Sequence, residues 1–381
     1  MTWATRRGTA PSQQACHRHK SESGNGTNDK REDDMTKWKT LTPLAAVLWL
    51  GGTVAVFAQT MSDTTKALYQ AAKKDGELTW YVSHFGLDNA TAVEQAFYKK
   101  YPGIKVNVVR ATAQVIYQRL NQDILANTQV ADVYSSTDNA HFVRLKADGR
   151  LLSYRPENAD KVLPIFQNMD PDNQYHATSG AIIVIAYRSD KISAADAPKS
   201  WTDLLDPRFK GKLSFGHPAY SGFVGAWAIA LEKKYGWSYF EKLRANNPQV
   251  GRSINDVITM LDAGERSVGH AGDGPFRKKE IEGAPYRTVF PEDGSVVILA
   301  GSGILKTSKR PNAAKLFMDF LLDVEPQQIR VDMDMGMPLR PEVKNVRGGK
   351  MPNEVNTIPV TDDDLKGLPA LNERWRSTFG G

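Results

Sequence analysis

The spacing of apolar residues predicts alternating strands and helices in the first part of the chain. Residues 77–83 form an apolar run typical of a strand, and residues 104–110 and 131–134 have the same pattern. Helical spacing covers residues 90–101 and 113–127 between them. Strands joined by connections of helical length pair in parallel, so this part of the chain is expected to be an α/β unit.

The second part of the chain repeats the pattern. The uninterrupted apolar run at 181–187 predicts a strand that is buried on both faces. A long apolar helix is expected at 222–235 and an amphipathic helix at 311–322. Extended apolar segments near 178–187 and 294–305 connect the two units. Two crossings between lobes permit a hinge, so a two-lobed α/β fold is predicted.

The N-terminus has the pattern of a signal peptide at residues 35–58. A basic start at Met35 is followed by an uncharged apolar stretch at 43–57 and the small residue Ala58. The apolar stretch is too short to span a bilayer comfortably, although an N-terminal membrane anchor is the alternative interpretation. No cysteine follows the stretch, so we expect a periplasmic protein without a lipid anchor. Residues 1–34 are polar and unpatterned, which indicates a non-native extension.

Removal of this segment changes what the composition implies. The whole chain of 381 residues has 49 Lys and Arg against 43 Asp and Glu, a net charge of +6. Eight of the basic and five of the acidic residues lie before Gln59, which leaves +3. The one cysteine, Cys16, is removed as well. Neither a nucleic-acid partner nor a disulfide or multi-cysteine zinc site is therefore expected.

Five sequence segments, taken in order, resemble one known family. They are Leu78-Thr-Trp-Tyr-Val-Ser-His84, Ala131-Asp-Val-Tyr134, Pro198-Lys-Ser-Trp-Thr-Asp-Leu-Leu-Asp-Pro207, Pro218-Ala-Tyr-Ser-Gly222 and Arg310-Pro-Asn-Ala-Ala314. The order and spacing are similar to those of periplasmic solute-binding proteins of ABC importers, extracellular solute-binding family 1, in the branch that binds ferric ion or phosphorylated compounds. The resemblance runs from about Gly76 to Pro341.

This resemblance implies a type II periplasmic-binding-protein clamshell with two hinge crossings. The ligand would bind in the cleft between the lobes and then pass to an ABC permease of the inner membrane. We expect lobe 1 at 59–177 plus 296–340, lobe 2 at 178–295, and a C-terminal tail at 341–381 that packs on the lobes.

Ligands of open α/β sheets bind beyond the carboxyl ends of the strands, and three predicted loops lie there. They supply the candidate ligand-binding residues Ser83, His84, Ser135, Ser136, Thr137, Tyr220, Ser221 and Gly222. Hydroxyls and backbone amides at helix starts suit an anion. The alternative is that these Ser and Thr residues only cap helices, and that His84 is a capping or surface residue.

Two charged residues complete the candidate site. Arg110 ends the second strand and could pair with a carboxylate or phosphate, unless it is a solvated surface arginine. Asp273 could accept hydrogen bonds from ligand hydroxyls or an amine, unless it stabilises a turn.

The ferric-ion interpretation can be checked against the residues that the resemblance implies. The branch uses a histidine where His84 lies, a glutamate near Thr137 and a tyrosine pair near Gly274-Pro275. The glutamate is missing, and the chain has no Tyr-Tyr dipeptide. A small organic anion, such as a carboxylate, a phosphonate or a sugar phosphate, is therefore the first expectation, and ferric ion is the alternative.

A binding protein is expected rather than an enzyme. A nucleophile elbow, a zinc-protease helix, a Walker loop and a dinucleotide fingerprint are all absent from the sequence. An enzyme on the same fold would need a base beside a nucleophile, whereas His84 and Asp273 are expected on different lobes. We therefore predict a monomer that has no cofactor and no bound metal.

Overall fold

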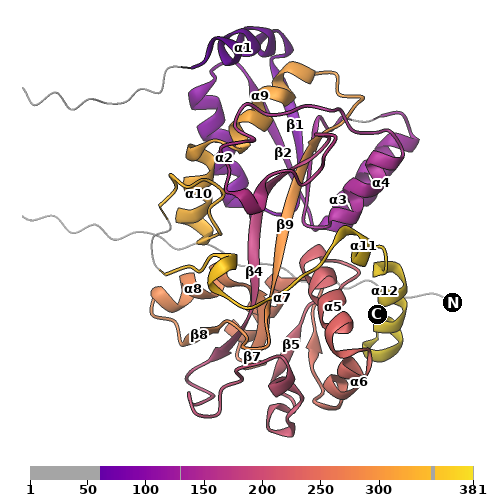
Figure 1. Cartoon of the computed structure of the whole chain (residues 1–381), viewed down its shortest axis with the longest axis vertical. Helices are drawn as coiled ribbons and strands as arrows, with labels where there is room; N and C mark the ends of the chain where they lie inside the picture. The colour runs from indigo at the N-terminus through magenta and orange to yellow at the C-terminus, as the bar shows by residue number, and fades with distance from the viewer. Residues whose placement is uncertain (1–60, 129, 345–347, 381) are drawn as a thin grey trace, which may run out of the picture. The chain divides into compact units, whose positions relative to one another are not determined.

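Two long strands, β4 (His176–Arg188) and β9 (Ser295–Ile304), run antiparallel to each other at the centre of one mixed sheet (Figure 1). The computed structural model describes residues 61–128, 130–344 and 348–380. The expected extension and signal peptide lie outside these residues, as does Cys16.

The upper part of the sheet contains β1 (Glu77–Val82), β2 (Lys105–Arg110) and β3 (Val133–Ser136). β1 pairs in parallel with both β2 and β3, and β3 pairs antiparallel with β9. The helices of this part are α1 (Asp63–Asp75), α2 (Leu87–Lys100), α3 (Ala113–Leu125), α4 (Asn139–Ala147), α9 (Pro311–Leu321) and α10 (Val324–Asp334).

The lower part contains β5 (Leu213–Phe215), β6 (Gln249–Val250), β7 (Val268–Gly272) and β8 (Tyr286–Val289). β7 and β8 pair antiparallel with β4, while β5 pairs in parallel with β6 and β7. The helices of this part are α5 (Gly222–Tyr235), α6 (Ser238–Ala245), α7 (Ile254–Asp262) and α8 (Asp273–Ile281).

The C-terminal segment returns to the sheet and to α5. Its elements are β10 (Thr357–Ile358), α11 (Asp362–Leu365) and α12 (Leu368–Phe379). β10 pairs with β9, α11 contacts both α4 and α5, and α12 contacts α5 and α6. The described residues also include four short 3₁₀ helices, at Pro164–Phe166, Thr202–Leu205, Pro207–Phe209 and Pro352–Glu354.

Strands β1 and β4 are buried on both faces, as their apolar runs predict. In β1, Trp80 and Val82 pack into one hydrophobic cluster, whereas Tyr81 packs into another. In β4, Ile183 and Ile185 join the cluster beneath α5, and the alternate residues join the cluster on the opposite face. Successive side chains of a strand point to opposite faces, so helices must cover both sides of the sheet.

The predicted α/β architecture with two crossings is confirmed. β9 pairs with β3 of the upper part and β4 pairs with β7 of the lower part, so both strands link the two parts (Figure 1). The expected lobe boundaries at 177/178 and 295/296 fall inside these strands and remain a prediction. α4, α8 and α10 were not expected, because their sequences lack a continuous apolar stripe.

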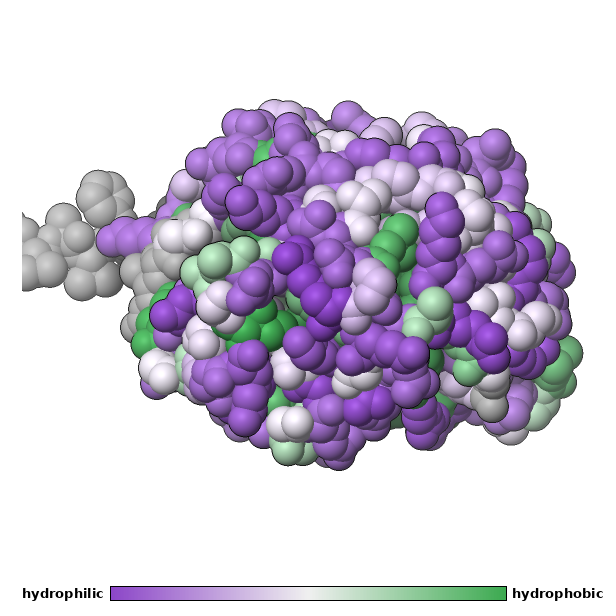
Figure 2. Space-filling model, turned by 90° about the horizontal axis from the view of Figure 1, so that it is seen from below, coloured by the Kyte–Doolittle hydropathy of each residue, from purple (hydrophilic) through white to green (hydrophobic). Residues whose placement is uncertain are grey.

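The described residues include no helix that is both long enough and apolar enough to cross a membrane. Seen from below, the surface is mainly hydrophilic and its hydrophobic residues form small groups (Figure 2).

Candidate functional site

A cavity of about 100 Å³ lies where the upper and lower parts of the sheet face each other. We call it the cleft. Six of the ten predicted ligand-binding residues line it, namely Ser83, His84, Arg110, Thr137, Tyr220 and Ser221. The first four come from the carboxyl ends of β1, β2 and β3, and the last two precede α5. The topology therefore brings together loops that are far apart in the sequence.

Four helices begin at the cleft. Gly86, Thr112, Ser221 and Ser253 are the N-cap residues of α2, α3, α5 and α7, and all four line the cavity. The first turn of a helix has backbone N–H groups without intrahelical partners, and the helix dipole places positive potential there. Four such ends around one small cavity favour an anionic ligand.

Arg110 adds a full positive charge to these partial charges. Its Nε donates to the carbonyl oxygen of Phe85 at 3.2 Å, which holds the side chain beside the cleft. Burial lowers the pKa of Arg110, but a guanidinium remains protonated in proteins. Within the described part of the chain, no ion pair joins Arg110 to a carboxylate. Its charge is thus available to a ligand.

Hydroxyl groups complete the upper wall. The hydroxyl oxygen of Ser83 accepts a hydrogen bond from the backbone N–H of Thr137 at 3.2 Å, which fixes one loop against the other. Thr112 has a buried hydroxyl that finds no hydrogen-bond partner among the described residues. A buried polar group without a partner is costly, and a ligand oxygen would satisfy it.

His84 lines the cleft in its neutral form. Burial lowers its pKa to about 3, and the nearby positive charge of Arg330 contributes to the shift. The ring Nε2 lies 3.3 Å from the hydroxyl of Thr178 on β4. The other ring nitrogen, Nδ1, is buried and has no partner in the described structure.

The lower wall is formed by the segment before α5 and by the start of α7. Ser221 is the N-cap of α5, but its side chain makes no capping hydrogen bond. The Tyr220 side chain is partly exposed, and the guanidinium of Arg252 lies 5.4 Å from the centre of its ring. The side chains of Tyr220 and Ser221 can therefore turn toward a ligand without breaking a hydrogen bond of the described structure.

Two predicted serines lie within a strand rather than in the loop after it. Ser135 and Ser136 are the last residues of β3 and pair with β9, and both are fully buried. The hydroxyl of Ser136 lies 3.0 Å from Nδ1 of His141 and accepts a hydrogen bond from the N–H of Asp138. The expectation that this pair forms the loop was wrong, because internal partners for both hydroxyls let the strand continue through them.

Gly222 and Asp273 do not line the cleft. A Cβ atom on Gly222 would lie 2.4 Å from the carbonyl oxygen of Thr137, so this glycine allows the two parts to approach closely. Asp273 occupies the first turn of α8, where it is buried and forms an ion pair with Arg277 at 3.0 Å. Asp273 was expected to bind ligand or, as the alternative, to stabilise a turn. It pairs with Arg277 instead of lining the cleft, and its segment begins a helix rather than a turn.

Sequence reasoning missed the contribution of α7. Ser253 and Asn255 line the cleft, and Ser253 forms a capping box with Asp256. The segment Ser253-Ile-Asn-Asp256 before an apolar run is a recognisable signal for a helix start. It could have placed the N-terminus of α7, although not its position beside Arg110.

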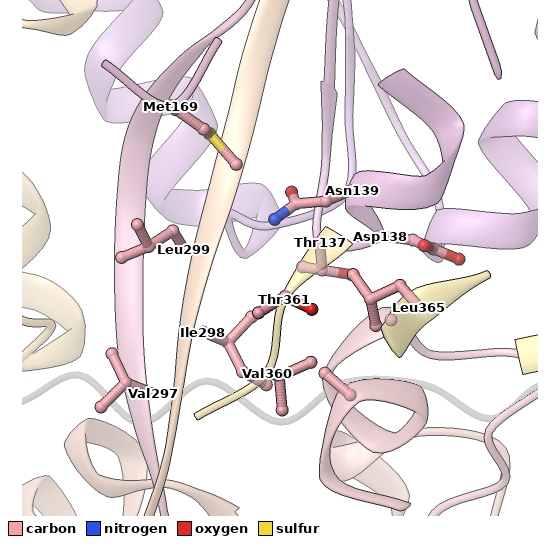
Figure 3. A pocket seen from close by; sticks show the side chains of 12 residues that line it. Thr137, Asp138, Asn139, Met169, Val297, Ile298, Leu299, Val360, Thr361 and Leu365 are labelled. Carbon is pink, nitrogen blue, oxygen red and sulfur yellow. The ribbon is translucent and has the colours of Figure 1, made fainter. Parts of the chain in front are cut away.

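A second cavity, of about 240 Å³, shares Thr137 with the cleft. Figure 3 shows Thr361 and Leu365 of the C-terminal segment beside Thr137, with Ile298 and Leu299 of β9 on the other side. Its described lining includes the carboxylate of Asp138 and neither Lys nor Arg, whereas the cleft has Arg110. We therefore take the cleft as the candidate ligand site.

Among its described lining residues, the cleft has no carboxylate donor for a ferric ion. No Asp or Glu lines it among the described residues, and the same part of the chain holds no group of three or more His, Cys, Asp or Glu that could bind a metal. Iron(III) is a hard cation that favours anionic oxygen ligands. The geometry supports an anion instead.

Comparisons with known proteins agree with this fold. The chain is 27% identical over 282 residues to a putative 2-aminoethylphosphonate-binding periplasmic protein of Salmonella paratyphi A, covering 71% of this chain and 77% of that protein. It is 25% identical over 269 residues to a major ferric iron-binding protein of Neisseria meningitidis, covering 67% and 78%. The solved structure of the periplasmic binding protein P5PA matches with a TM-score of 0.71 at 24% identity, covering 80% of this chain and 99% of that one.

The family model for bacterial extracellular solute-binding proteins matches residues 128–366, which is more than half of the chain. Together with the two linked α/β parts and the cleft between them, this match shows that the chain belongs to the bacterial extracellular solute-binding protein family.

Proposed function

We propose that this protein captures a small organic anion in the cleft and delivers it to an ABC importer. The observation that carries the proposal is the meeting of four helix N-termini and the cationic Arg110 in a cavity without a carboxylate among its described lining residues. Such a site offers positive potential from all sides and nothing that repels an anion.

A phosphonate is the first choice within this class. The Salmonella relative is named for 2-aminoethylphosphonate, which supports it. The volume of about 100 Å³ is small beside the ~300–1,000 Å³ of pockets for drug-sized ligands, which favours a compact head group. Carboxylates and sugar phosphates present similar oxygens, so they belong to the same test.

In the proposed complex, Arg110 pairs with two ligand oxygens, as a planar guanidinium does with carboxylate or phosphate. The hydroxyls of Thr112 and Thr137 donate to the same group from the upper wall, and that of Ser83 joins them by turning away from the backbone oxygen of Ser135. Tyr220 and Ser221 close over it from below. Ligand stabilises the closed arrangement only if it binds that arrangement better than the open one.

Ferric ion is the alternative ligand, named for the Neisseria relative. It would have to use His84 and Tyr220, because the cleft supplies neither a carboxylate nor a second tyrosine among its described residues. Such a donor set is poor in negative charge, and the positive Arg110 would oppose the cation.

We also propose that the ligand leaves unchanged, and that the protein acts as a periplasmic monomer released by its signal peptide without a lipid anchor. Acyl or phosphoryl transfer to the protein would need a nucleophile beside a base. In the cleft, the Ser83 hydroxyl lies within reach of the backbone oxygen of Ser135, and Nε2 of His84 faces Thr178. Neither arrangement activates a nucleophile.

A thermal-shift screen followed by calorimetry tests the proposal. The compounds are 2-aminoethylphosphonate, inorganic phosphate, glycerol 3-phosphate, succinate and ferric citrate, with citrate alone as the control for iron. A rise in melting temperature with a phosphonate or phosphate supports the proposal. A rise with ferric citrate alone contradicts it. Phosphorus NMR of the released ligand then tests whether it is unchanged, because an enzyme would deplete it.

A further inference from the structure

A chain of hydrogen bonds leads from the upper core to the cleft; we call it the hydroxyl chain. The indole Nε1 of Trp80 donates to the hydroxyl of Ser135 at 2.8 Å. The hydroxyl oxygens of Ser135 and Ser302 are 2.6 Å apart, as are those of Ser302 and Thr178. The Thr178 hydroxyl lies 3.3 Å from Nε2 of His84. Trp80, Ser135, Ser302 and Thr178 lie on β1, β3, β9 and β4, in that order. His84, at the end of the hydroxyl chain, lines the cleft.

The first link sets the direction of the hydroxyl chain. An indole N–H can only donate, so the Ser135 oxygen is an acceptor in that bond. The one other partner of this hydroxyl in the described structure is Ser302. If Ser302 donated to Ser135, the hydrogen of Ser135 would be buried in the core without an acceptor, which is costly. The opposite order leaves the unpartnered hydrogen on His84, which lines the cleft, where a ligand oxygen can accept it. Ser135 therefore donates to Ser302.

The same reasoning applies at each following link. Because Ser302 accepts from Ser135, its own hydrogen goes to Thr178. Thr178 then accepts from Ser302 and donates its hydrogen to Nε2 of His84. Every hydroxyl of the chain has one donor bond and one acceptor bond in this order. The two central distances of 2.6 Å are those of strong O–H···O hydrogen bonds.

We propose that the hydroxyl chain fixes His84 as the tautomer with its hydrogen on Nδ1, so that His84 presents an N–H donor to the ligand. This inference rests on the proposed function, because it takes the cleft as the ligand site. A neutral imidazole has one N–H and one lone pair. Since Nε2 uses its lone pair to accept from Thr178, the hydrogen must be on Nδ1, the ring nitrogen without a partner.

The surroundings of His84 keep its ring neutral. Only a neutral imidazole has two tautomers, so the position of its one hydrogen matters. Burial and the charge of Arg330 lower the pKa of His84 to about 3, and a proton is not added at neutral pH. A doubly protonated ring would donate from both nitrogens and would conflict with the donor hydroxyl of Thr178.

With this tautomer, His84 discriminates between anionic ligands and metal ions. An N–H group binds acceptor oxygens such as those of a phosphonate, phosphate or carboxylate. A metal ion needs a lone pair on the ring nitrogen that it contacts. To bind a metal through Nδ1, the ring would have to move its hydrogen to Nε2 and lose the bond from Thr178. The hydroxyl chain thus favours anions over cations at this position.

Nitrogen-15 NMR of the histidine-labelled, ligand-free protein tests the tautomer directly, with His84→Gln used to assign its signals. We expect the proton on Nδ1 and the unprotonated shift at Nε2. The reverse assignment would overturn the inference whatever the ligand is. If wild-type protein binds none of the anions while the ligand-free spectrum shows the Nδ1 proton, the proposed function fails and the tautomer stands.

Two variants of Thr178 test whether the hydroxyl chain is the cause. Thr178→Val removes the donor to Nε2 and should leave a mixture of the two tautomers, whereas Thr178→Ser keeps the hydroxyl and should keep the Nδ1 proton. An unchanged spectrum in Thr178→Val would show that the hydroxyl chain does not fix the ring.

Binding to the ligand is tested with 2-aminoethylphosphonate and inorganic phosphate as probes. His84→Leu should bind the better probe roughly ten- to hundredfold more weakly, because it loses a hydrogen bond to a charged acceptor. His84→Asn keeps an N–H donor and should recover part of the affinity. Equal affinities of His84→Leu and wild type would contradict the role of His84 as a donor.

Discussion

Gly222 at the start of α5 lies directly against the backbone of Thr137 at the end of β3. A Cβ atom added to Gly222 would come within 2.4 Å of the Thr137 carbonyl oxygen and 2.6 Å of the Asp138 nitrogen. Backbone atoms cannot move aside as a flexible side chain can. The absence of a side chain at residue 222 therefore permits the lower part of the sheet to close on the upper one at the edge of the cleft.

Gly222→Ala should therefore impair closure. Overpacking costs about 1–3 kcal/mol, which corresponds to a five- to 150-fold loss of affinity if the closed state is the one that binds. Calorimetry measures the affinity for the ligand found in the screen, and small-angle scattering measures whether the protein still contracts on binding.

Gly272→Ala is the matched control for this variant. A Cβ atom there would lie 3.4 Å from the nearest atom, Ala181 Cβ, which is an ordinary contact. This variant should bind and contract as the wild type does. Wild-type affinity in Gly222→Ala would show that closure does not require the contact with Thr137.

Substitution of Arg110 tests whether the cleft binds an anion. Arg110→Gln removes the one full positive charge among the described lining residues of the cleft but keeps N–H donors. A hydrogen bond to a charged group contributes about 1.5–3 kcal/mol, so anion affinity should fall about ten- to hundredfold. Arg144→Gln is the control, because Arg144 is exposed and pairs with Asp148 on the surface. If ferric ion were the ligand, Arg110→Gln would not weaken binding.

The helices and strands that were predicted correctly have strong local sequence signals. Helix α5 was predicted with its observed bounds, because an apolar run begins at Gly222 and ends before Gly236, which adopts a φ of 74° that favours glycine. β4 and β9 were recognised because each contains an uninterrupted apolar run, at 181–187 in β4 and at 296–300 in β9. These signals depend on a few neighbouring residues, so they can be recognised without knowledge of the fold.

The expectations that failed had both local and long-range causes. Ser136 was expected in a loop because apolar residues end at Tyr134, but its hydroxyl is satisfied inside the fold by His141. A turn was the alternative to ligand binding at Asp273, but the segment begins α8, and Pro275 is compatible with the first turn of a helix. The place of Ser253 in the cleft follows from the pairing of β5 with β6 and β7, which sequence periodicity does not reveal.

The C-terminal helix should contribute strongly to stability. Trp375 of α12 is fully buried, and its ring centre lies 5.3 Å from that of Phe240 and 6.2 Å from that of Trp227. Trp375→Ala should lower the free energy of unfolding by about 3–5 kcal/mol, because it leaves a cavity in the lower core. Urea unfolding followed by circular dichroism measures the loss.

Tyr98→Ala, which removes a half-exposed ring from α2, is the control and should change the free energy of unfolding by less than about 1 kcal/mol. A similarly small effect of Trp375→Ala would mean that α12 is not part of the lower core in solution.

Asp319 should make the stability depend on pH. Its carboxylate is buried and accepts hydrogen bonds from the Tyr154 hydroxyl at 2.8 Å and from the N–H of Glu157 at 2.9 Å. Burial raises the pKa of Asp319 to about 6, and the nearby charges of Glu157 and Asp323 add to the shift. The folded protein thus holds this proton more tightly than the unfolded chain does, for which the usual pKa is near 3.8.

The sign of the effect follows from this difference. The contribution of Asp319 to stability is fully present below about pH 4 and is lost as the pH rises through about 6, a change of about 3 kcal/mol. Asp319→Asn cannot ionise, so its free energy of unfolding should gain that amount relative to wild type between pH 4 and 7. Urea unfolding of both proteins across this range measures the difference. Asp160→Asn, at an exposed position, should follow the wild-type curve, and a parallel curve for Asp319→Asn would show that Asp319 ionises alike in both states.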